Sequence, residues 1–201
     1  MTDLHETATN NTVALPIAAP SYEIRAERGS DVAARESLLD VCFGASRHAR
    51  TCQRLRDGRL PAEGLAFSAV VQGRLVGTIR LWHVDAGGRA ALMLGPLAVD
   101  PGARDLGLGA ALMNHAIAEA SARGHGAIVL LGDAPYYARF GFMPRKMADL
   151  ALPGPFERDR LLGLELKPRA LDGARGIIFG SGKWVRKAAE PAEPADLAHA
   201  A

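Results

Sequence analysis

Three residues suited to binding an anion are crowded where an apolar run gives way to a helical pattern. The stretch "LGPLAVDPGARDLGLGAALMNHAIAEA", residues 94–120, places Arg104, Gly107 and Gly109 at the expected first turn of that helix. A helix N-terminus has unpaired amides and a partial positive charge, and glycines let an anion approach without a Cβ in the way. The dipole contributes only about 0.3–1 kcal/mol, so several amides and the Arg104 guanidinium must share the binding of a phosphate or diphosphate.

Two common phosphate-binding loops do not match this stretch. No Lys-Ser or Lys-Thr pair follows Gly109, as a P-loop requires, and the stretch lacks the G-x-G-x-x-G fingerprint of dinucleotide-binding folds. A magnesium nucleotide and NAD are therefore poor ligands for this turn. On these residues alone, a glycine-tolerant turn that binds nothing is the open alternative.

Composition limits the classes of function. A chain of 201 residues, 48% of them hydrophobic, is long enough for one domain with a sizeable core. Its formal net charge of +2 predicts neither a nucleic acid nor a membrane surface as partner. Cys42 and Cys52 have no CxxC spacing, so we expect no disulfide framework, no metal site and a reducing, cytoplasmic location.

The two ends of the chain differ in composition from its middle. Residues 1–20 carry Asp3 and Glu6 where a signal peptide has positive charge, and prolines break their short apolar run. Residues 186–201 are rich in Ala, Pro and Glu. We expect both ends to be disordered tails that flank a single domain at residues 21–185.

Hydrophobic periodicity predicts the elements that must position the glycine turn. Residues 65–99 are rich in apolar and β-branched residues, and glycine-containing turns at 72–73 and 86–88 divide them into three antiparallel strands. Ser30 is the expected N-cap of the first helix. The predicted elements are a strand at 22–28, helices at 31–43 and 46–58, three strands within 65–99, a helix at 107–123, a strand at 127–133, a short helix at 135–142 and a final strand at 160–168.

The helix at 107–123 is expected to connect two parallel strands. The strand after it is apolar without alternation, as in strands buried on both faces, and the strand–helix–strand order predicts parallel pairing with the "LGPLAV" strand. The predicted fold class is mixed α/β, a mostly antiparallel sheet of about six to seven strands with helices on both faces. The stripe that the helix is expected to bury is Leu112, Met113, Ala116, Ile117 and Ala120.

Two motifs in register resemble the GCN5-related N-acetyltransferase family. One is Arg-x-x-Gly-x-Gly after a strand ending in Val-Asp-Pro, and the other is "YYARFGF", which follows the next strand. The stretches "LGPLAVDP" and "LELKPRALDGARG" also resemble one subgroup of that family, and the likeness covers residues 22–184. The resemblance implies a sheet with a splayed pair of parallel central strands. It also implies an acetyl-CoA-dependent enzyme that acetylates a primary amine by direct attack in a ternary complex, without a metal.

The resemblance further implies which residues hold acetyl-CoA. In the family a bulge exposes the backbone of the strand before the glycine turn, and that backbone pairs with the pantetheine arm. Here this strand is Gly95–Val99, and Pro96 suits a strand that gives up a ladder bond. Asp105 is an unexpected neighbour for the pyrophosphate. The implied binding residues are Leu97, Ala98, Val99, Arg104, Leu106, Gly107, Leu108, Gly109 and Ala110.

Tyr137 matches the family's general acid, a phenol that protonates the coenzyme A thiolate as the tetrahedral intermediate collapses. A phenol with a pKa of about 10 is still protonated at neutral pH, as this role requires. The alternative is an aromatic residue that fills the core, which describes its neighbours Phe140 and Phe142 better. Tyr136 is expected to serve packing.

The general base is left unassigned. The acceptor amine must be neutral to attack a thioester. At neutral pH only about one lysine-like amine in 2,500 is neutral. Asp133 is one candidate, although it also suits the N-cap of the short helix at 135–142. His83 and Asp85 are weaker candidates, and a water molecule relaying the proton to backbone carbonyls is an equal alternative.

The polar segment 46–58 carries arginines at helical spacing. Such a run is most often a solvated face, whereas an acidic acceptor or an acidic acyl carrier protein is the alternative that would use it. Cys42 and Cys52 are expected to be small hydrophobic residues and not nucleophiles. The arginines are Arg47, Arg50 and Arg54, with Arg56 and Arg59 close by.

Three alternatives to the main functional hypothesis stay open from sequence. The domain could bind or sense acyl-CoA without catalysis, or it could use longer acyl-CoA or acyl carrier protein donors. The acceptor is expected to be a small-molecule or peptide amine, and a homodimer is one option for the assembly.

Overall fold

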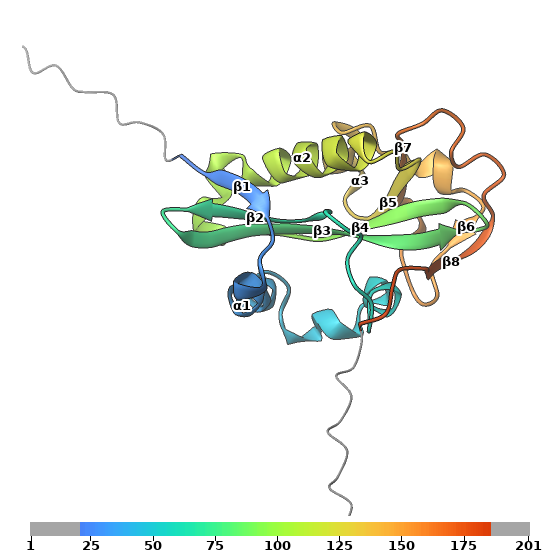
Figure 1. Ribbon diagram of the computed structural model, residues 1–201. Helices are drawn as coiled ribbons and strands as arrows, with labels where there is room; N and C mark the ends of the chain where they lie inside the picture. Colours follow the sequence, from blue (N-terminus) through green and yellow to red (C-terminus); the bar gives the residue numbers. More distant parts are fainter. Residues whose placement is uncertain (1–20, 186–201) are drawn as a thin grey trace, which may run out of the picture.

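A single sheet of eight strands organises the protein (Figure 1). The computed structural model describes residues 21–185, so both predicted tails lie outside the described residues. The main strand order is β1-β2-β3-β4-β5-β7, while β8 pairs with β3 and with the short β6. The strands are β1 (Glu23–Ala26), β2 (Ala66–Val71), β3 (Arg74–Ala86), β4 (Ala90–Val99), β5 (Ala127–Leu131), β6 (Leu150–Ala151), β7 (Leu161–Glu165) and β8 (Gly176–Gly180).

Helices cover both faces of the sheet, as the sequence predicted (Figure 1). Helix α2 (Leu108–Ala122) lies on one face, and α1 (Val32–Phe43) lies on the other with the short 3-10 helices that follow it. Helix α3 (Ala134–Ala138) follows β5. The 3-10 helices are Gly29–Asp31, Ala45–Ala49, Thr51–Leu55, Pro101–Leu106, Pro144–Met147 and Arg158–Arg160.

The two predicted hairpins form where the sequence placed them. Gln72 and Gly73 both have positive φ, 48° and 79°, which is the backbone of a tight turn that follows the twist of the flanking strands. At the turn between β3 and β4, the Asp85 carboxylate accepts a hydrogen bond from the Gly88 amide at 2.6 Å. These turns bring β2, β3 and β4 into an antiparallel meander.

Strands β4 and β5 form the predicted parallel pair, but only briefly. Their ladder consists of Leu92 opposite Ile128 and Met93 opposite Val129. Beyond these two positions the strands diverge, which confirms the expected splayed pair.

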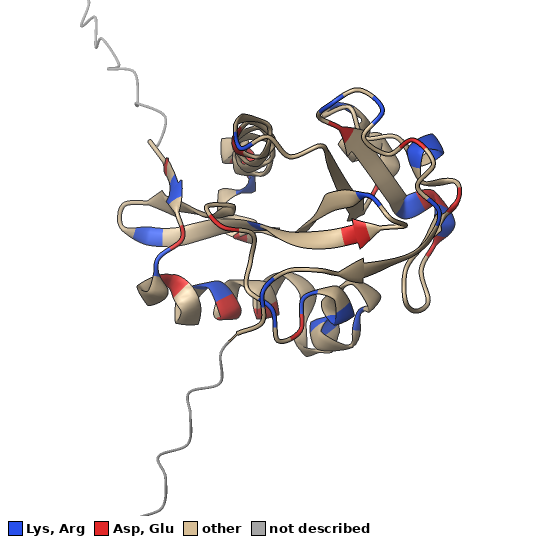
Figure 2. Ribbon diagram, turned by 45° about the vertical axis from the view of Figure 1, so that its right-hand side comes forward, with Lys and Arg blue, Asp and Glu red and all other residues tan. Residues whose placement is uncertain are grey.

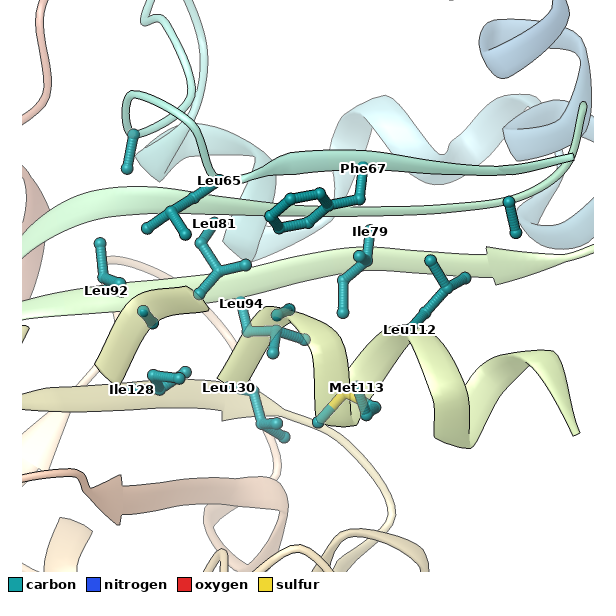
Figure 3. Packing of buried hydrophobic residues seen from close by; sticks show 14 of the residues in the cluster. Leu65, Phe67, Ile79, Leu81, Leu92, Leu94, Leu112, Met113, Ile128 and Leu130 are labelled. Carbon is teal, nitrogen blue, oxygen red and sulfur yellow. The ribbon is translucent and has the colours of Figure 1, made fainter. Parts of the chain in front are cut away.

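The face of α2 that meets the sheet forms the larger part of the core (Figure 3). Leu112 and Met113 are fully buried against side chains of β3, β4 and β5. Ala116 and Ala120 are buried as predicted, whereas Ile117 is only partly buried at the edge of the cluster. Burying side chains of this size stabilises by about 1.5–3 kcal/mol each, which fixes the position of the helix start.

Two helical predictions for the N-terminal half are wrong. Ser30 does not cap α1, because residues 29–31 form a 3-10 turn that runs directly into the helix. The predicted helix at 46–58 is two 3-10 helices separated by Arg50, which has extended dihedrals (φ −68°, ψ 144°). Hydrogen bonds from Thr51 to the Pro155 carbonyl (2.5 Å) and from Arg54 to the Pro153 carbonyl (2.9 Å) tie this segment to a distant loop. These tertiary contacts override the local helical spacing.

The C-terminal part contains two strands that the sequence analysis missed. The strand predicted at 160–168 is β7, but it is not the last, because β8 follows and pairs antiparallel with β3 and parallel with β6. In β8 only Ile178 is buried, while Ile177 and Phe179 are exposed. The segment GIIFG is a short apolar run bounded by glycines, which is compatible with a strand, and the sequence analysis overlooked it.

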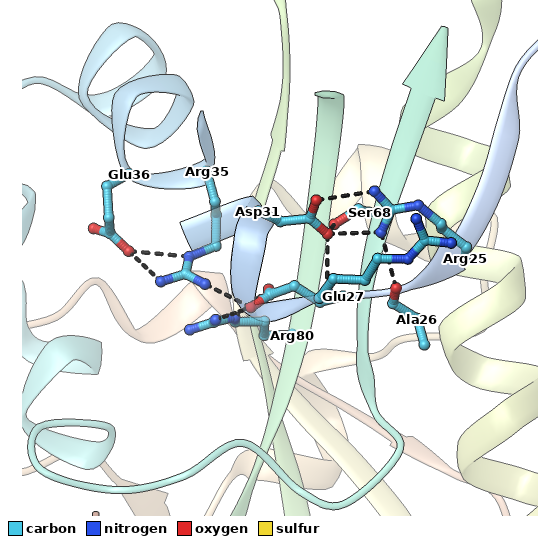
Figure 4. A network of polar contacts seen from close by, with 9 residues as sticks. Arg25, Ala26, Glu27, Asp31, Arg35, Glu36, Ser68 and Arg80 are labelled. Carbon is cyan, nitrogen blue, oxygen red and sulfur yellow. Dashed lines mark hydrogen bonds and ion pairs between the residues drawn. The ribbon is translucent and has the colours of Figure 1, made fainter. Parts of the chain in front are cut away.

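A network of buried and partly buried charges joins β1, α1 and the meander (Figure 4). Asp31 accepts hydrogen bonds from both terminal nitrogens of Arg25 (2.7 and 2.9 Å), from the Arg28 amide (2.8 Å) and from Ser68 (3.0 Å). The bonds from Arg25 hold the pKa of the Asp31 carboxyl far below its usual range, against the opposing effect of burial. Asp31 is therefore an anion that four donors stabilise in the folded state.

We expect Asp31→Asn to lower the free energy of unfolding by about 2 kcal/mol at neutral pH, because it removes the charge from hydrogen bonds to charged donors. The pKa of Asp31 is depressed in the folded state, so its contribution is present above about pH 4 and is lost as pH falls toward the folded pKa. Urea unfolding across this range measures both effects. Asp159→Asn, at an exposed carboxylate, is the control. A deficit that does not shrink as the pH falls would contradict the electrostatic account.

Candidate active site

A bulge in β4 opens the sheet at the point where β4 and β5 separate. Ile79 lies opposite Leu97 and Leu81 opposite Leu94, so one residue of β3, Arg80, faces two residues of β4. The two are Gly95 and Pro96, as the sequence analysis anticipated for this segment. The Trp82 indole nitrogen donates a hydrogen bond to the Gly95 carbonyl at 2.7 Å and holds the bulge from β3. The β5-facing edge of β4 is thereby left without a strand partner after Met93.

The glycine turn leads directly into α2. Gly107 has φ +67°, a left-handed conformation that closes the preceding 3-10 helix. The Ala111 amide donates to the Gly107 carbonyl at 3.1 Å, which starts the helical ladder. The amides of Leu108, Gly109 and Ala110 precede it and are the groups that a helix start leaves for a ligand. The Gly107 amide is engaged with the Arg104 carbonyl at 3.3 Å.

Two adjoining cavities flank the open edge of β4. The first, of about 500 Å³, runs along the glycine turn and is called the loop cavity. The second, of about 590 Å³, borders residues 45–59, which contain two of the 3-10 helices and are called the 3-10 segment; this cavity is called the arginine cavity. Phe43, Leu97, Tyr136 and Tyr137 line both, so the two cavities meet at these residues.

Most of the residues implied for acetyl-CoA binding gather in the loop cavity. The Leu108 side chain is fully buried and Leu106 packs on the core, so only their backbone is available to a ligand. Asp105 is exposed and does not line the cavity. Those of the implied residues that do line it are Leu97, Ala98, Val99, Arg104, Gly107, Gly109 and Ala110.

Tyr137 stands on α3 at the junction of the two cavities. The Asp133 carboxylate accepts a hydrogen bond from the Tyr136 amide at 3.3 Å and caps this five-residue helix, the structural role that the sequence allowed for Asp133. The Tyr137 ring packs edge-on against Tyr136 and Phe142, at centroid distances of 5.0 and 6.0 Å. Burial raises the pKa of Tyr137 to about 12. Its hydroxyl is therefore protonated at neutral pH.

Gly132 makes room for the Tyr137 ring. A Cβ at residue 132 would lie 2.2 Å from the Tyr137 Cε2 and 2.7 Å from its Cδ2. The ring is thus pressed onto the backbone at the end of β5. Nothing in the sequence motif distinguished this glycine from an ordinary turn residue.

Of the base candidates, the structure brings only Asp133 to the site, where it lines the arginine cavity together with Tyr137. His83 lies beside His125, with ring centroids 5.5 Å apart, and lines neither cavity. Asp85 serves the hairpin turn described above. Neither His83 nor Asp85 therefore lines either cavity.

The arginines of the 3-10 segment divide into two groups. Arg54 is bound to the Pro153 carbonyl, and Arg59 stacks on Trp184 at 4.0 Å from its ring centroid, so neither lines a cavity. In Figure 2 blue segments mark Lys and Arg positions along this part of the chain, below the sheet. Arg47, Arg50 and Arg56 line the arginine cavity together with Arg160, which the sequence analysis missed because it follows a distant loop.

Both cysteines are partly buried and pack at the edge of the core. Cys42 lines the loop cavity and donates a hydrogen bond from its thiol to the Val99 carbonyl at 3.4 Å. Burial raises the pKa of both Cys42 and Cys52, which favours the thiol over the nucleophilic thiolate. Neither cysteine is in a disulfide.

Residues 33–142, more than half of the chain, match the sequence profile of the acetyltransferase (GNAT) family. The chain therefore belongs to this family, and the N-acetyltransferase class that the motifs predicted is confirmed. Of the functional alternatives, this membership supports the enzyme and not the non-catalytic binding domain.

The subgroup likeness is confirmed by a relative and by its solved structure. The chain is 29% identical over 157 residues to the uncharacterized N-acetyltransferase YhbS of Escherichia coli, covering 77% of this chain and 93% of that protein. The crystal structure of Escherichia coli YhbS in complex with CoA superposes with a TM-score of 0.70 at 28% identity, covering 88% of this chain and 94% of that one. A GNAT acetyltransferase of Brucella melitensis in complex with acetyl-CoA shares the fold, with a TM-score of 0.58 at 24% identity, covering 81% of this chain and 97% of that one.

The part of the chain that the structure describes holds neither a cluster of metal-binding side chains nor a membrane-spanning helix. Residues 21–185 contain no group of three or more His, Cys, Asp or Glu side chains placed to hold a metal ion. None of the helices within the same residues is long and apolar enough to cross a membrane.

We expect Gly132→Ala to lower the free energy of unfolding by about 1–3 kcal/mol, because the new methyl group overlaps the Tyr137 ring. Urea unfolding measures the loss. Gly29→Ala is the control, since a Cβ there meets nothing within 4 Å and the backbone φ is not positive.

A double-mutant cycle separates the ring contact from a general intolerance at residue 132. In a Tyr137→Ala background the cost of Gly132→Ala should fall below about 0.5 kcal/mol, because the ring is gone. An undiminished cost in that background would show that the Tyr137 ring is not what Gly132 accommodates.

Proposed function

We propose that acetyl transfer takes place at the junction of the two cavities, with acetyl-CoA in the loop cavity and the amine in the arginine cavity. Three features fit acetyl-CoA as the donor substrate: the unpaired edge of β4, the free first-turn amides of α2 and the Arg104 guanidinium beside them. The pantetheine arm would pair with Leu97–Val99. The pyrophosphate would meet the free amides of Leu108, Gly109 and Ala110.

The observation that carries this proposal is the position of Tyr137, a protonated phenol on α3 that lines both cavities where they meet. The amine nitrogen attacks the thioester carbon, the C–S bond breaks, and the coenzyme A thiolate takes the Tyr137 proton. Solvent then returns a proton to Tyr137. The proton lost by the amine passes to a base in the arginine cavity or to water, and the phenol forms no covalent bond with the acetyl group.

The Tyr136 hydroxyl lies closer to the first turn of α2 than a packing role alone requires. A Cβ at Gly109 would lie 3.1 Å from the Tyr136 hydroxyl oxygen, so this hydroxyl borders the first turn of α2. We assign it to the donor side of the site and Tyr137 to the reacting side. The two tyrosines should therefore differ in the kinetic constant that they affect.

We expect Tyr137→Phe to lower kcat while leaving the affinity for acetyl-CoA nearly intact, because it deletes the proton donor and keeps the ring. Removing a general acid or base usually lowers the rate about 10²–10⁴-fold. We expect a loss in kcat near the lower end, because a thiolate is a tolerable leaving group. Release of free thiol with a panel of primary amines measures the rate.

Tyr136→Phe is the matched control and should change the KM for acetyl-CoA more than kcat. If Tyr136→Phe lost turnover and Tyr137→Phe did not, the roles of the two residues would be exchanged. If neither variant lost turnover, the site would need no phenolic acid.

We expect Gly109→Val to weaken binding of coenzyme A more than it harms the fold, since the side chain fills the approach to the amides and presses on Tyr136. Coenzyme A should raise the melting temperature of the wild-type protein, with about 2.7 kcal/mol of stabilisation at a hundredfold excess over Kd, and ATP and NAD should do less. Calorimetric titration of the folded variant gives the affinity.

The control for that variant is Gly102→Ala, in the preceding 3-10 helix, where the new Cβ makes only ordinary contact with Asp100. Equal stabilisation by coenzyme A, ATP and NAD would refute the assignment of the loop cavity. An unchanged affinity in Gly109→Val would show that the glycine serves helix packing.

The expected compartment is the cytoplasm. The partial burial of two free thiols, Cys42 and Cys52, is in keeping with a reducing environment. Detection of the tagged full-length chain in cell fractions tests this.

A further inference from the structure

The arginine cavity carries far more positive than negative charge. Four arginines line it, and Asp133 is the one carboxylate among its lining residues, all of which lie in the described part of the chain. A volume of about 590 Å³ suits a small molecule, and part of it must hold the thioester end of acetyl-CoA.

One of the four arginines is accounted for within the protein. Arg47 forms ion pairs with Glu36 at 2.5 Å and with Asp40 at 2.7 Å, and these contacts fix it to α1. Arg160 contacts only the exposed Glu157, at 3.3 Å, an interaction of little strength in water. Arg50 donates to the Phe43 carbonyl at 3.4 Å, a neutral partner.

Arg56 carries a charge that no ion pair among residues 21–185 balances. One terminal nitrogen donates to the neutral Gln53 side chain at 3.0 Å, while its Nε is buried without a hydrogen-bond partner among residues 21–185. Burial lowers the pKa of this guanidinium, which marks the cost of keeping it charged there. A buried donor on a charged group costs free energy when it has no hydrogen-bond partner. An anion in the cavity would supply that partner.

The guanidinium groups of Arg56, Arg160 and Arg50 lie near one another beside the reacting position. Burial raises the pKa of Cys52, and Arg56, Arg160 and Arg50 all oppose that rise, so all three lie close to the same thiol. Arg160 likewise opposes the burial that raises the pKa of Tyr137. Arg56 also reaches the bulge, 3.9 Å from where a Cβ of Gly95 would be. The positive charge therefore extends from the bulge to the general acid.

We propose that the acceptor is a small primary amine that also carries a carboxylate, which Arg56 binds with help from Arg160 and Arg50. This assignment rests on the proposed function and names its acceptor class. Guanidinium groups bind carboxylates with paired, charge-assisted hydrogen bonds, and such a bond would satisfy the Arg56 Nε. The same cations favour the neutral form of the acceptor amine, the form that attacks a thioester.

A protein-borne acceptor fits this cavity less well than a small molecule does. Arg56 lies deep, under the 3-10 segment, so a folded acidic partner would contact only the exposed Arg50 and Arg160. The size of the cavity and the burial of its unsatisfied donor both favour a free amino acid or a similar compound.

The test compares acceptors that differ in the carboxylate alone. Glycine, longer ω-amino acids and α-amino acids are each paired with the corresponding primary amide, and thiol release from acetyl-CoA is measured. For at least one pair we expect kcat/KM to be about 10- to 100-fold higher for the acid, as for other hydrogen bonds to charged groups. Calorimetric titration of the same compounds into the coenzyme A complex gives binding independently of turnover.

Arg56→Gln and Arg160→Gln should each reduce kcat/KM at least about tenfold more for the acid than for its amide. Arg54→Gln, in the same segment but bound to the Pro153 carbonyl, should alter neither. Arg160 is exposed, so its variant serves if Arg56→Gln fails to fold.

The outcomes separate this inference from the proposed function. Equal use of acids and amides would overturn the inference while leaving acetyl transfer intact. Better acetylation of an acidic peptide than of any free amino acid would also overturn it. Binding of the acid but not the amide to the coenzyme A complex, with no thiol release, would support the inference and refute the proposed function.

Discussion

The early separation of β4 from β5 is the constraint on which the site depends. Two residue pairs hold the parallel strands together, and the bulge opposite Arg80 then turns β4 away. A strand edge inside a domain normally has a partner, because unpaired backbone groups are costly when buried. Here the gap leaves that edge to a ligand, with the start of α2 on one side and α3 on the other. The loop cavity and the arginine cavity are the two halves of this gap.

A network of buried and partly buried ion pairs connects the bulged part of the sheet with α1. Arg80, which faces the bulge, pairs with Glu27, and Glu27 also accepts a hydrogen bond from Arg35 of α1 at 2.5 Å (Figure 4). Helix α1 contributes Leu39 and Phe43 to the lining of the arginine cavity. The network thus connects the bulge to the helix that borders the arginine cavity. Partly buried ion pairs of this kind specify one arrangement more than they add stability.

Sequence reasoning succeeded where chemistry and geometry are local. The hairpins at 72–73 and 86–88, the helix ended by Gly124 and the cap at Asp133 all depend on residues within a few positions of one another. It failed in the segment 46–58, where Thr51 and Arg54 bond to carbonyls about a hundred residues away and break the helical spacing. It also failed at β8, whose pairing partners β3 and β6 lie far from it in the sequence.

By itself the sequence determined the family, the antiparallel meander, the parallel pair and the helix that begins at the glycine turn, because these follow from local turns, periodicity and motif spacing. Only the tertiary structure decided what faces that turn. It placed Trp82 against the bulge, Gly132 under the Tyr137 ring and Arg160 beside Arg56. These contacts join residues far apart in the chain, and no local pattern encodes which distant side chains share a cavity. The positively charged arginine cavity is therefore a property of the packed sheet and its covering segments.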